Sequence, residues 1–144
     1  MEFMKEALKE GKKAFDIGEI PIGAIIVKDN KIIGRGHNIK ENSKDPTMHA
    51  EIIAIKEACK NIGDWRLNGC CMYVTLEPCP MCTGAILQSR ISKLYIGTFN
   101  KDMGACGSVV NLVDNRSLNS FVETNWLYDE ECSELLQEFF KIRR

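Results

Sequence analysis

Two short segments of the sequence carry residues that could bind a metal ion and move protons. DPTMHAEI contains His49 and, two residues later, Glu51, while TLEPCPMC contains Cys79 and Cys82. A Cys-x2-Cys spacing can present two thiolates to one tetrahedral zinc ion, and a histidine nitrogen is a suitable third ligand. The sequence therefore predicts one zinc ion per chain, held by His49, Cys79 and Cys82.

Glu51 is expected to transfer protons rather than to bind the metal. A structural zinc site is closed by a fourth Cys or His, but the other histidine, His37, precedes this region and no second cysteine pair has a suitable spacing. The fourth position is then left for water, which predicts a catalytic site. In such a site Glu51 takes a proton from the water and delivers it to the substrate.

Each motif alone has a simpler interpretation. A histidine at a helix start usually caps the helix or faces solvent, and a lone Cys-x2-Cys can be a redox pair or two buried thiols. The combination of His-x-Glu with a later Pro-Cys-x-x-Cys is much rarer, and it is the signature of zinc-dependent nucleobase deaminases. The other five cysteines lack such a spacing and are interpreted as ordinary thiols: Cys59, Cys70, Cys71, Cys106 and Cys132.

The elements around these motifs predict a single α/β domain over residues 1–144. Apolar periodicity and turn residues indicate helices at 2–17, 48–61, 80–90 and from Asp129 onward, and strands at 22–27, 31–38, 71–76 and 93–99. This alternation predicts a layered sheet with parallel pairing near its end. Because the carboxyl ends of parallel strands meet at one edge, the histidine and the cysteine pair are expected to lie close together there.

Composition limits the setting of the protein. The chain has 44% hydrophobic residues, a charged N-terminal segment and apolar runs too short to span a bilayer, so we expect a cytoplasmic protein with no membrane association. Its net charge of −1 and pI near 6.1 do not indicate a nucleic-acid binder, although a local basic patch can act in a neutral protein. In a reducing compartment the seven cysteines favour metal binding over disulfides.

The motifs resemble a known family. HAE with PCPMC resembles the cytidine deaminase-like superfamily, and IPIGAIIV, GRGHN, DPTMHAEI, YVTLEPCPMC, GACGS and FFKIRR resemble, in order, the bacterial tRNA-specific adenosine deaminases that convert wobble adenosine to inosine. The resemblance implies a three-layer α/β/α sandwich with a central mixed sheet. It also implies zinc at His49, Cys79 and Cys82, proton transfer by Glu51, contact of Asn38 with a flipped base, and a homodimer with active sites near the interface.

The implied partner is the anticodon loop of a tRNA, in which zinc-activated water attacks C6 of adenine and ammonia leaves. A base in that loop is already partly unstacked, which lowers the cost of moving it into a pocket. Phosphate contacts are expected from basic residues near the C-terminus and after the last predicted strand, and the candidates are Lys101, Lys141, Arg143 and Arg144.

The chain departs from the family at two places expected near the nucleic acid. Asn100 replaces a usual aspartate, and Asn119-Ser120 replaces a usual Asn-His pair. Loss of the aspartate is expected to weaken discrimination at the ribose 2′-OH, although asparagine also suits a simple turn.

Two other functions fit the motifs. One is a zinc-dependent deaminase of a free purine base or nucleoside such as guanine. The more remote one is a non-catalytic zinc module that binds RNA or protein, but such a module has no use for Glu51.

Overall fold

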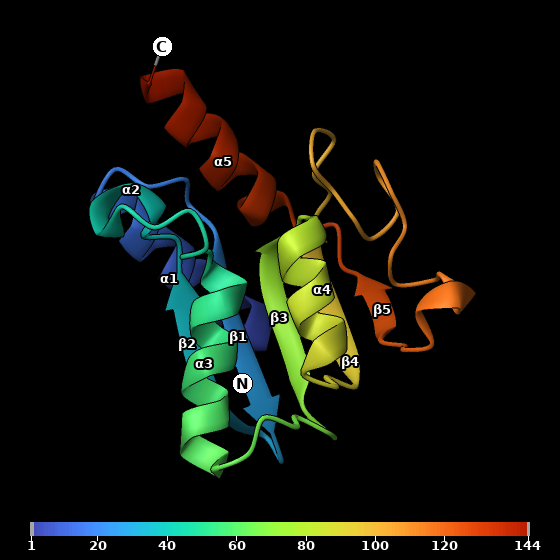
Figure 1. Ribbon diagram of the computed structural model, residues 1–144. Helices are drawn as coiled ribbons and strands as arrows, with labels where there is room; N and C mark the ends of the chain where they lie inside the picture. Colours follow the sequence, from blue (N-terminus) through green and yellow to red (C-terminus); the bar gives the residue numbers. More distant parts are fainter. Residues whose placement is uncertain (1, 144) are drawn as a thin grey trace.

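The computed structural model describes residues 2–143, and its centre is a five-stranded sheet of order β2-β1-β3-β4-β5 (Figure 1). The helices lie on both faces of this mixed sheet, which gives the expected three-layer α/β/α sandwich. The elements are α1 (Phe3–Asp16), β1 (Gly23–Lys28), β2 (Lys31–His37), α2 (Lys40–Ser43), α3 (Ala50–Ile62), β3 (Cys71–Leu76), α4 (Pro80–Gln88), β4 (Lys93–Thr98), the 3-10 helix η1 (Arg116–Leu118), β5 (Glu123–Trp126) and α5 (Glu130–Ile142).

Eight of these elements follow the sequence-based prediction within a few residues, and three were not predicted: α2, η1 and β5. The hairpin between β1 and β2 turns at Asp29 and Asn30, which have φ values of 50° and 63° as a tight turn of this kind requires. Asp129 caps α5 by accepting hydrogen bonds from the backbone of Glu131 and Cys132. Between residues 2 and 143, none of the helices has the length and apolar character needed to cross a bilayer.

Alternating side chains of the central strands build two cores. On one face, Ala24, Ile26 and their neighbours in β3 and β4 pack against α3 and α4. On the other face, Ile25 and Val27 pack with α1 and the start of α5, and the stacked rings of Tyr73 and Tyr95 lie 4.5 Å apart. Because both faces are covered, these strands are apolar on both sides.

The direction of the strands determines where the helices begin. β1 is antiparallel to both β2 and β3, and β4 is parallel to β3 and β5, so four strands point one way and only β1 points the other. The starts of α3 and α4 both follow strands that point toward the same edge, the upper one in Figure 1. The predicted parallel pairing of β3 with β4 is confirmed.

Two glycines of β2 let α3 lie directly on the sheet. A Cβ atom at Gly34 or Gly36 would clash with the carbonyl oxygen of Ala54 or Ala50, respectively. Close packing of α3 on β2 therefore depends on these glycines, and it fixes the position of the helix start that carries His49.

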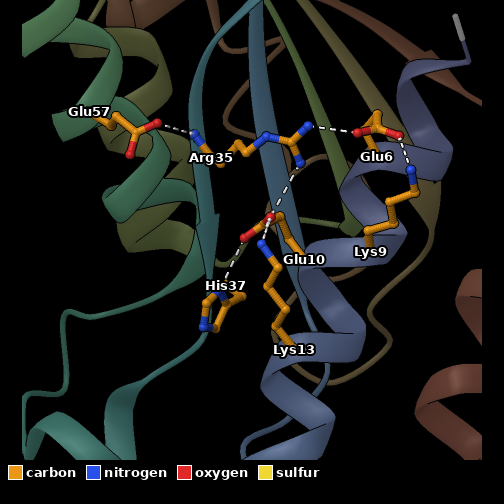
Figure 2. Close-up of polar contacts among 7 residues, drawn as sticks. All are labelled: Glu6, Lys9, Glu10, Lys13, Arg35, His37 and Glu57. Carbon is orange, nitrogen blue, oxygen red and sulfur yellow. Dashed lines mark hydrogen bonds and ion pairs between the residues drawn. The ribbon is translucent and has the colours of Figure 1, made fainter.

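An ion-pair cluster ties α1 to β2 on the opposite face (Figure 2). Arg35 on β2 donates to Glu6 at 2.6 Å and to Glu10 at 3.3 Å. Glu10 also accepts from Lys13 at 2.8 Å, and its other oxygen lies 3.1 Å from Nδ1 of His37. His37 is thus committed to this cluster, which agrees with its exclusion as a fourth zinc ligand.

Candidate active site

The predicted zinc ligands occupy the first positions of two helices. His49 and Cys79 are the N-cap residues of α3 and α4, each has an extended backbone, and neither side chain caps its own helix. Pro80 suits the first turn of α4, and Cys82 lies in that same turn. Partial positive charge at both helix N-termini favours thiolates at this edge of the sheet.

Asn38 performs the capping that His49 does not. This residue follows β2, is buried, and its Oδ1 accepts a hydrogen bond of 2.9 Å from the backbone N–H of Ala50. The first backbone N–H of α3 is therefore hydrogen-bonded by a residue outside the helix. As a result the imidazole of His49 is available for other contacts.

The three side chains are spaced as ligands of one zinc ion. Nδ1 of His49 lies 3.7 Å from Sγ of Cys79 and 3.5 Å from Sγ of Cys82, and one ligand atom from each of the three residues lies within 4.8 Å of the others. Tetrahedral zinc with ordinary Zn–S and Zn–N lengths separates a sulfur from a nitrogen ligand by about 3.6 Å. The residues therefore fit zinc without rearrangement.

The protonation of the cysteines also suits metal binding. A hydrogen bond from the Cys82 thiol, assisted by His49, lowers the pKa of Cys79 to about 4 in spite of partial burial. The same contact raises the pKa of Cys82, and hydrogen bonding with Cys79 raises the pKa of His49. Cys79 is thus a thiolate at neutral pH, and binding of a dication displaces the remaining protons.

Glu51 lies in the first turn of α3 and is only 3% exposed. Burial raises its pKa to about 7, because a charged carboxylate loses hydration there. A carboxyl group with a pKa near the operating pH can both accept and return a proton. Its position beside the ligand residues, and not among them, fits the role predicted from the sequence.

A cavity of about 560 Å³ opens onto these residues, a size within the range of small-molecule sites. We call it the zinc-site cavity. It is lined by His49, Glu51 and Cys79 together with Asn38, and by apolar side chains that include Ile20, Phe99 and Phe140. A flat, largely apolar group with a few polar edges matches such a lining.

The predicted substrate residues Asn38, Asn100 and Lys101 all line this cavity. Since Oδ1 of Asn38 is already bonded to the backbone, its amide N–H groups are the part left for a ligand. Oδ1 of Asn100 accepts hydrogen bonds of 3.1 Å from the backbone of both Asp102 and Met103. Asn100 therefore forms the turn that its residue type favours, at the edge of the cavity.

Arg143 lies apart from the zinc-site cavity. Its guanidinium is 5.0 Å above the ring of Phe139 and donates a hydrogen bond to the carbonyl of Gly18. It lines a neighbouring cavity of about 530 Å³ that shares Asn38 and Lys40 with the zinc-site cavity. Arg144 lies outside the described residues.

Ser120, one of the departures from the family pattern, lies in a different region. Its hydroxyl accepts a hydrogen bond of 3.4 Å from Arg90, and together with Asn119 it lines a cavity of about 310 Å³ beside α4. Ser120 therefore lies in a different region of the structure from Asn100, the other departure from the family pattern.

Sequence reasoning missed two buried carboxylates that shape the surroundings of the site. Glu19 accepts hydrogen bonds from the backbone of Glu41 and Asn42 and so holds α2. Glu77, two residues before Cys79, is bonded to the loop that follows β4. A charged residue between a buried strand and a ligand motif was the available signal for Glu77.

Comparison with known proteins agrees with this geometry. The family model of the cytidine and deoxycytidylate deaminase zinc-binding region matches residues 1–98. The chain is 51% identical to the tRNA-specific adenosine deaminase of Aquifex aeolicus (strain VF5) over 139 residues, which are 96% of this chain and 92% of the relative.

Two solved structures are also similar. One comes from a study of A-to-I editing by tRNA:A34 deaminases at the wobble position of transfer RNA; it has a TM-score of 0.89 and 39% identity, covering 93% of this chain and 98% of that chain. The other is a guanine deaminase from Bacillus subtilis, with a TM-score of 0.66 and 42% identity, covering 69% of this chain and 64% of that chain. Because the agreement with tRNA deaminases extends over nearly the whole sequence and fold, the chain belongs to the cytidine and deoxycytidylate deaminase family, in the branch of the tRNA-specific adenosine deaminases.

Proposed function

We propose that this protein hydrolytically deaminates adenosine to inosine at the wobble position of tRNA. The observation that carries the proposal is the buried Glu51 beside the His49, Cys79 and Cys82 ligand set, inside a cavity of suitable size. Relatives that match nearly the whole chain are named tRNA-specific adenosine deaminases, which supports the choice of substrate.

His49, Cys79 and Cys82 hold the zinc ion, which when bound supplies the Lewis acidity that activates water for attack on C6 of adenine. Glu51 accepts one proton from the attacking water and passes it to the purine ring nitrogen, then takes the second proton from the hydroxyl now on C6 and passes it to the amino group, which leaves as ammonia. Burial disfavours the charged form of Glu51 and so helps its carboxylate to accept a proton. The amide of Asn38 donates a hydrogen bond that orients the base.

The target base leaves the anticodon loop and enters the zinc-site cavity, while the rest of the RNA stays outside. Basic residues at the rim then meet phosphates, which position the RNA without reading its sequence. Lys101 lies at the rim of the zinc-site cavity and Arg143 at that of its neighbour. We assign the phosphate contacts to these residues, together with Arg144.

The test is incubation of the zinc-loaded protein with an anticodon stem-loop that carries adenosine at the wobble position, followed by nucleoside analysis for inosine. The matched substrate has guanosine at that position. Free guanine is the third substrate, since the guanine deaminase of B. subtilis is a relative that matches a smaller part of this chain. Release of ammonia from guanine but not from the stem-loop would overturn the proposal. Activity on none of the three substrates would favour a non-catalytic zinc module.

We further propose that the protein acts in the cytoplasm as a homodimer with its active sites near the subunit interface, as the resemblance to this family implies. Several large apolar side chains between β4 and β5 are exposed, which supports such an interface: Val109, Val110, Leu118 and Phe121. Light scattering coupled to size exclusion should give twice the chain mass. A single-chain mass at all concentrations would rule the dimer out.

A further inference from the structure

Glu77 is a buried carboxylate that the proposed mechanism does not use. It is 1% exposed and lies between β3 and the ligand Cys79. Within residues 2–143, no Lys, Arg or His side chain forms an ion pair with Glu77. A buried charge of this kind is costly unless other groups replace its hydration.

Donors from one loop replace that hydration. We call residues 99–108, which follow β4, the 99–108 loop. Oε1 of Glu77 accepts a hydrogen bond of 3.0 Å from the backbone N–H of Asn100, and Oε2 accepts bonds of 2.9 Å from Cys106 and 3.1 Å from Ser108. The hydroxyl of Ser108 donates a further bond to Oε1. The loop thus wraps around the carboxylate and bonds to it near both of its ends.

The loop is also packed too closely around Glu77 to tolerate a change at its centre. The backbone N–H of Gly104 bonds to the carbonyl of Asn100 at 2.9 Å. A Cβ atom at Gly104 would lie 2.4 Å from the carbonyl oxygen of Asn100 and 2.5 Å from the Glu77 carboxylate. Real Cβ atoms do not approach other atoms this closely, so the loop and the carboxylate form one fitted unit.

The same loop forms one side of the zinc-site cavity, to which it contributes Phe99, Asn100, Lys101, Asp102 and Met103. Whatever holds this loop therefore sets the shape of the cavity before a substrate arrives. Preorganisation of this kind lowers the cost of binding, because less loop entropy is lost when the complex forms.

We propose that Glu77 is a positioning residue whose carboxylate fixes the 99–108 loop as a preformed side of the zinc-site cavity and thereby sets the affinity for the RNA substrate. The affinity part of this inference rests on the proposed function. Glu77 acts through the loop, so its loss weakens binding of the substrate more than it slows the chemical step, which depends on Glu51 and the metal ligands.

The main test is Glu77→Gln, which keeps the size of the side chain but replaces one acceptor oxygen by an NH₂ group that faces N–H donors. We expect KM for the stem-loop to rise by about tenfold or more with kcat within about threefold of the wild type. Ser108→Ala removes one of the four donors and should raise KM by a smaller factor. This second variant keeps the proposal testable if Glu77→Gln does not fold.

Glu10→Gln is the matched control, because Glu10 is another buried, multiply bonded carboxylate, but it belongs to the α1–β2 cluster (Figure 2) and lines a different cavity. Its KM should equal that of the wild type. The proposal fails if kcat falls while KM is unchanged in Glu77→Gln, or if Glu10→Gln raises KM to the same extent. Zinc content is measured in all variants. Loss of zinc from Glu77→Gln would mean that the substitution acts through the ligand Cys79 and not through the loop.

Hydrogen exchange of the substrate-free protein separates this inference from the proposed function. In Glu77→Gln, the amides of Asn100, Cys106 and Ser108 should exchange faster than in the wild type, and in Glu10→Gln they should not. Unchanged exchange overturns the positioning role whatever the substrate is. If exchange is faster in Glu77→Gln but the wild type does not modify the stem-loop, then Glu77 does position the loop and the proposed function is wrong.

Discussion

Glu10 and Glu77 are both buried carboxylates, but different groups compensate their charges. Glu10 is surrounded by the cations of Lys13 and Arg35 and by His37, which come from α1 and β2. Glu77 is surrounded by backbone N–H groups of one loop. The cationic partners join two regular elements that would pack against the same core in any case. The amide partners give a defined shape to a segment that has no regular structure.

Glu51 is a third buried carboxylate and differs from both. It has neither the cations that surround Glu10 nor the loop amides that surround Glu77, and burial raises its pKa to about 7. Stabilised charge at Glu10 and Glu77 suits residues that hold structure, whereas a poorly stabilised charge suits a residue that must change its protonation state. The following substitutions test this division of roles.

The largest effect is expected for Glu51→Ala. Removal of the proton-transfer group should lower kcat by about 10²–10⁴-fold, while zinc content stays near one per chain and the circular dichroism spectrum is unchanged. Loss of zinc together with activity would mean that Glu51 is a ligand and that its separation from the metal-binding residues is wrong.

Gly104→Ala tests how closely the 99–108 loop is packed, both on its own backbone and on Glu77. The added Cβ would lie 2.4 Å from the carbonyl oxygen of Asn100 and 2.5 Å from the Glu77 carboxylate, so we expect about 1–3 kcal/mol of destabilisation and a raised KM for the stem-loop. Gly84→Ala is the control, because no atom of residues 2–143 outside its own helix turn lies within 4 Å of a Cβ there, and the residue is inside helix α4. That variant should be as stable as the wild type or more stable. Equal effects of both changes in thermal unfolding would contradict the close fit.

Glu10→Gln should affect stability rather than catalysis, by about 1–3 kcal/mol near neutral pH. Burial acts to raise the pKa of Glu10, but hydrogen bonds from Lys13, His37 and Arg35 outweigh it and hold the pKa below the ordinary 4.5. A lowered pKa in the folded state means that the contribution to stability is present above about pH 4.5 and is lost as the pH falls through the folded-state pKa.

Urea unfolding at neutral pH and at pH 3 measures this contribution. The difference in stability between the wild type and Glu10→Gln should be smaller at the acidic pH. A difference that grows on acidification would show that the charge of Glu10 does not stabilise the fold.

The smallest effect is expected for Asn100→Asp. A carboxylate can still accept the two backbone bonds that Oδ1 of Asn100 accepts, so stability should change by less than about 0.5 kcal/mol. The added charge at the edge of the cavity should increase the preference for RNA over single-stranded DNA, because it can accept a bond from a ribose 2′-OH. The measurement is the ratio of deamination rates on matched RNA and DNA oligonucleotides. An unchanged ratio would mean that residue 100 only forms the turn and does not contact the sugar.

The ligand set and most of the sheet could be predicted because their signals are local. The Cys79–Cys82 spacing, the alternation in β1 and the Asp29-Asn30 turn each lie within a few residues of sequence. The meeting of His49 with the cysteines also followed, since strand direction alone brings their helices to one edge. The proton-transfer role of Glu51 stays a prediction.

The missed features depend on partners far away in the sequence. α2 has four residues and is held from outside by Glu19, and β5 is a short edge strand whose residues pair with β4 only in the folded sheet. The role of Glu77 depends on donors that follow it by more than twenty residues. Such contacts are properties of the tertiary structure: the local pattern can single out Glu77 as an unusual charge, but it does not indicate which groups bond to it.

The strand order also determines when a newly made chain can first hold its metal. Because β1 lies between β2 and β3, the helix starts that carry His49 and Cys79 meet only after Ala24 has paired with Val74 across the sheet. Pairings between residues so distant in sequence form slowly during folding. The zinc site is therefore complete only in a chain in which this long-range pairing has formed. The free energy of metal binding then stabilises the finished sheet rather than an early hairpin.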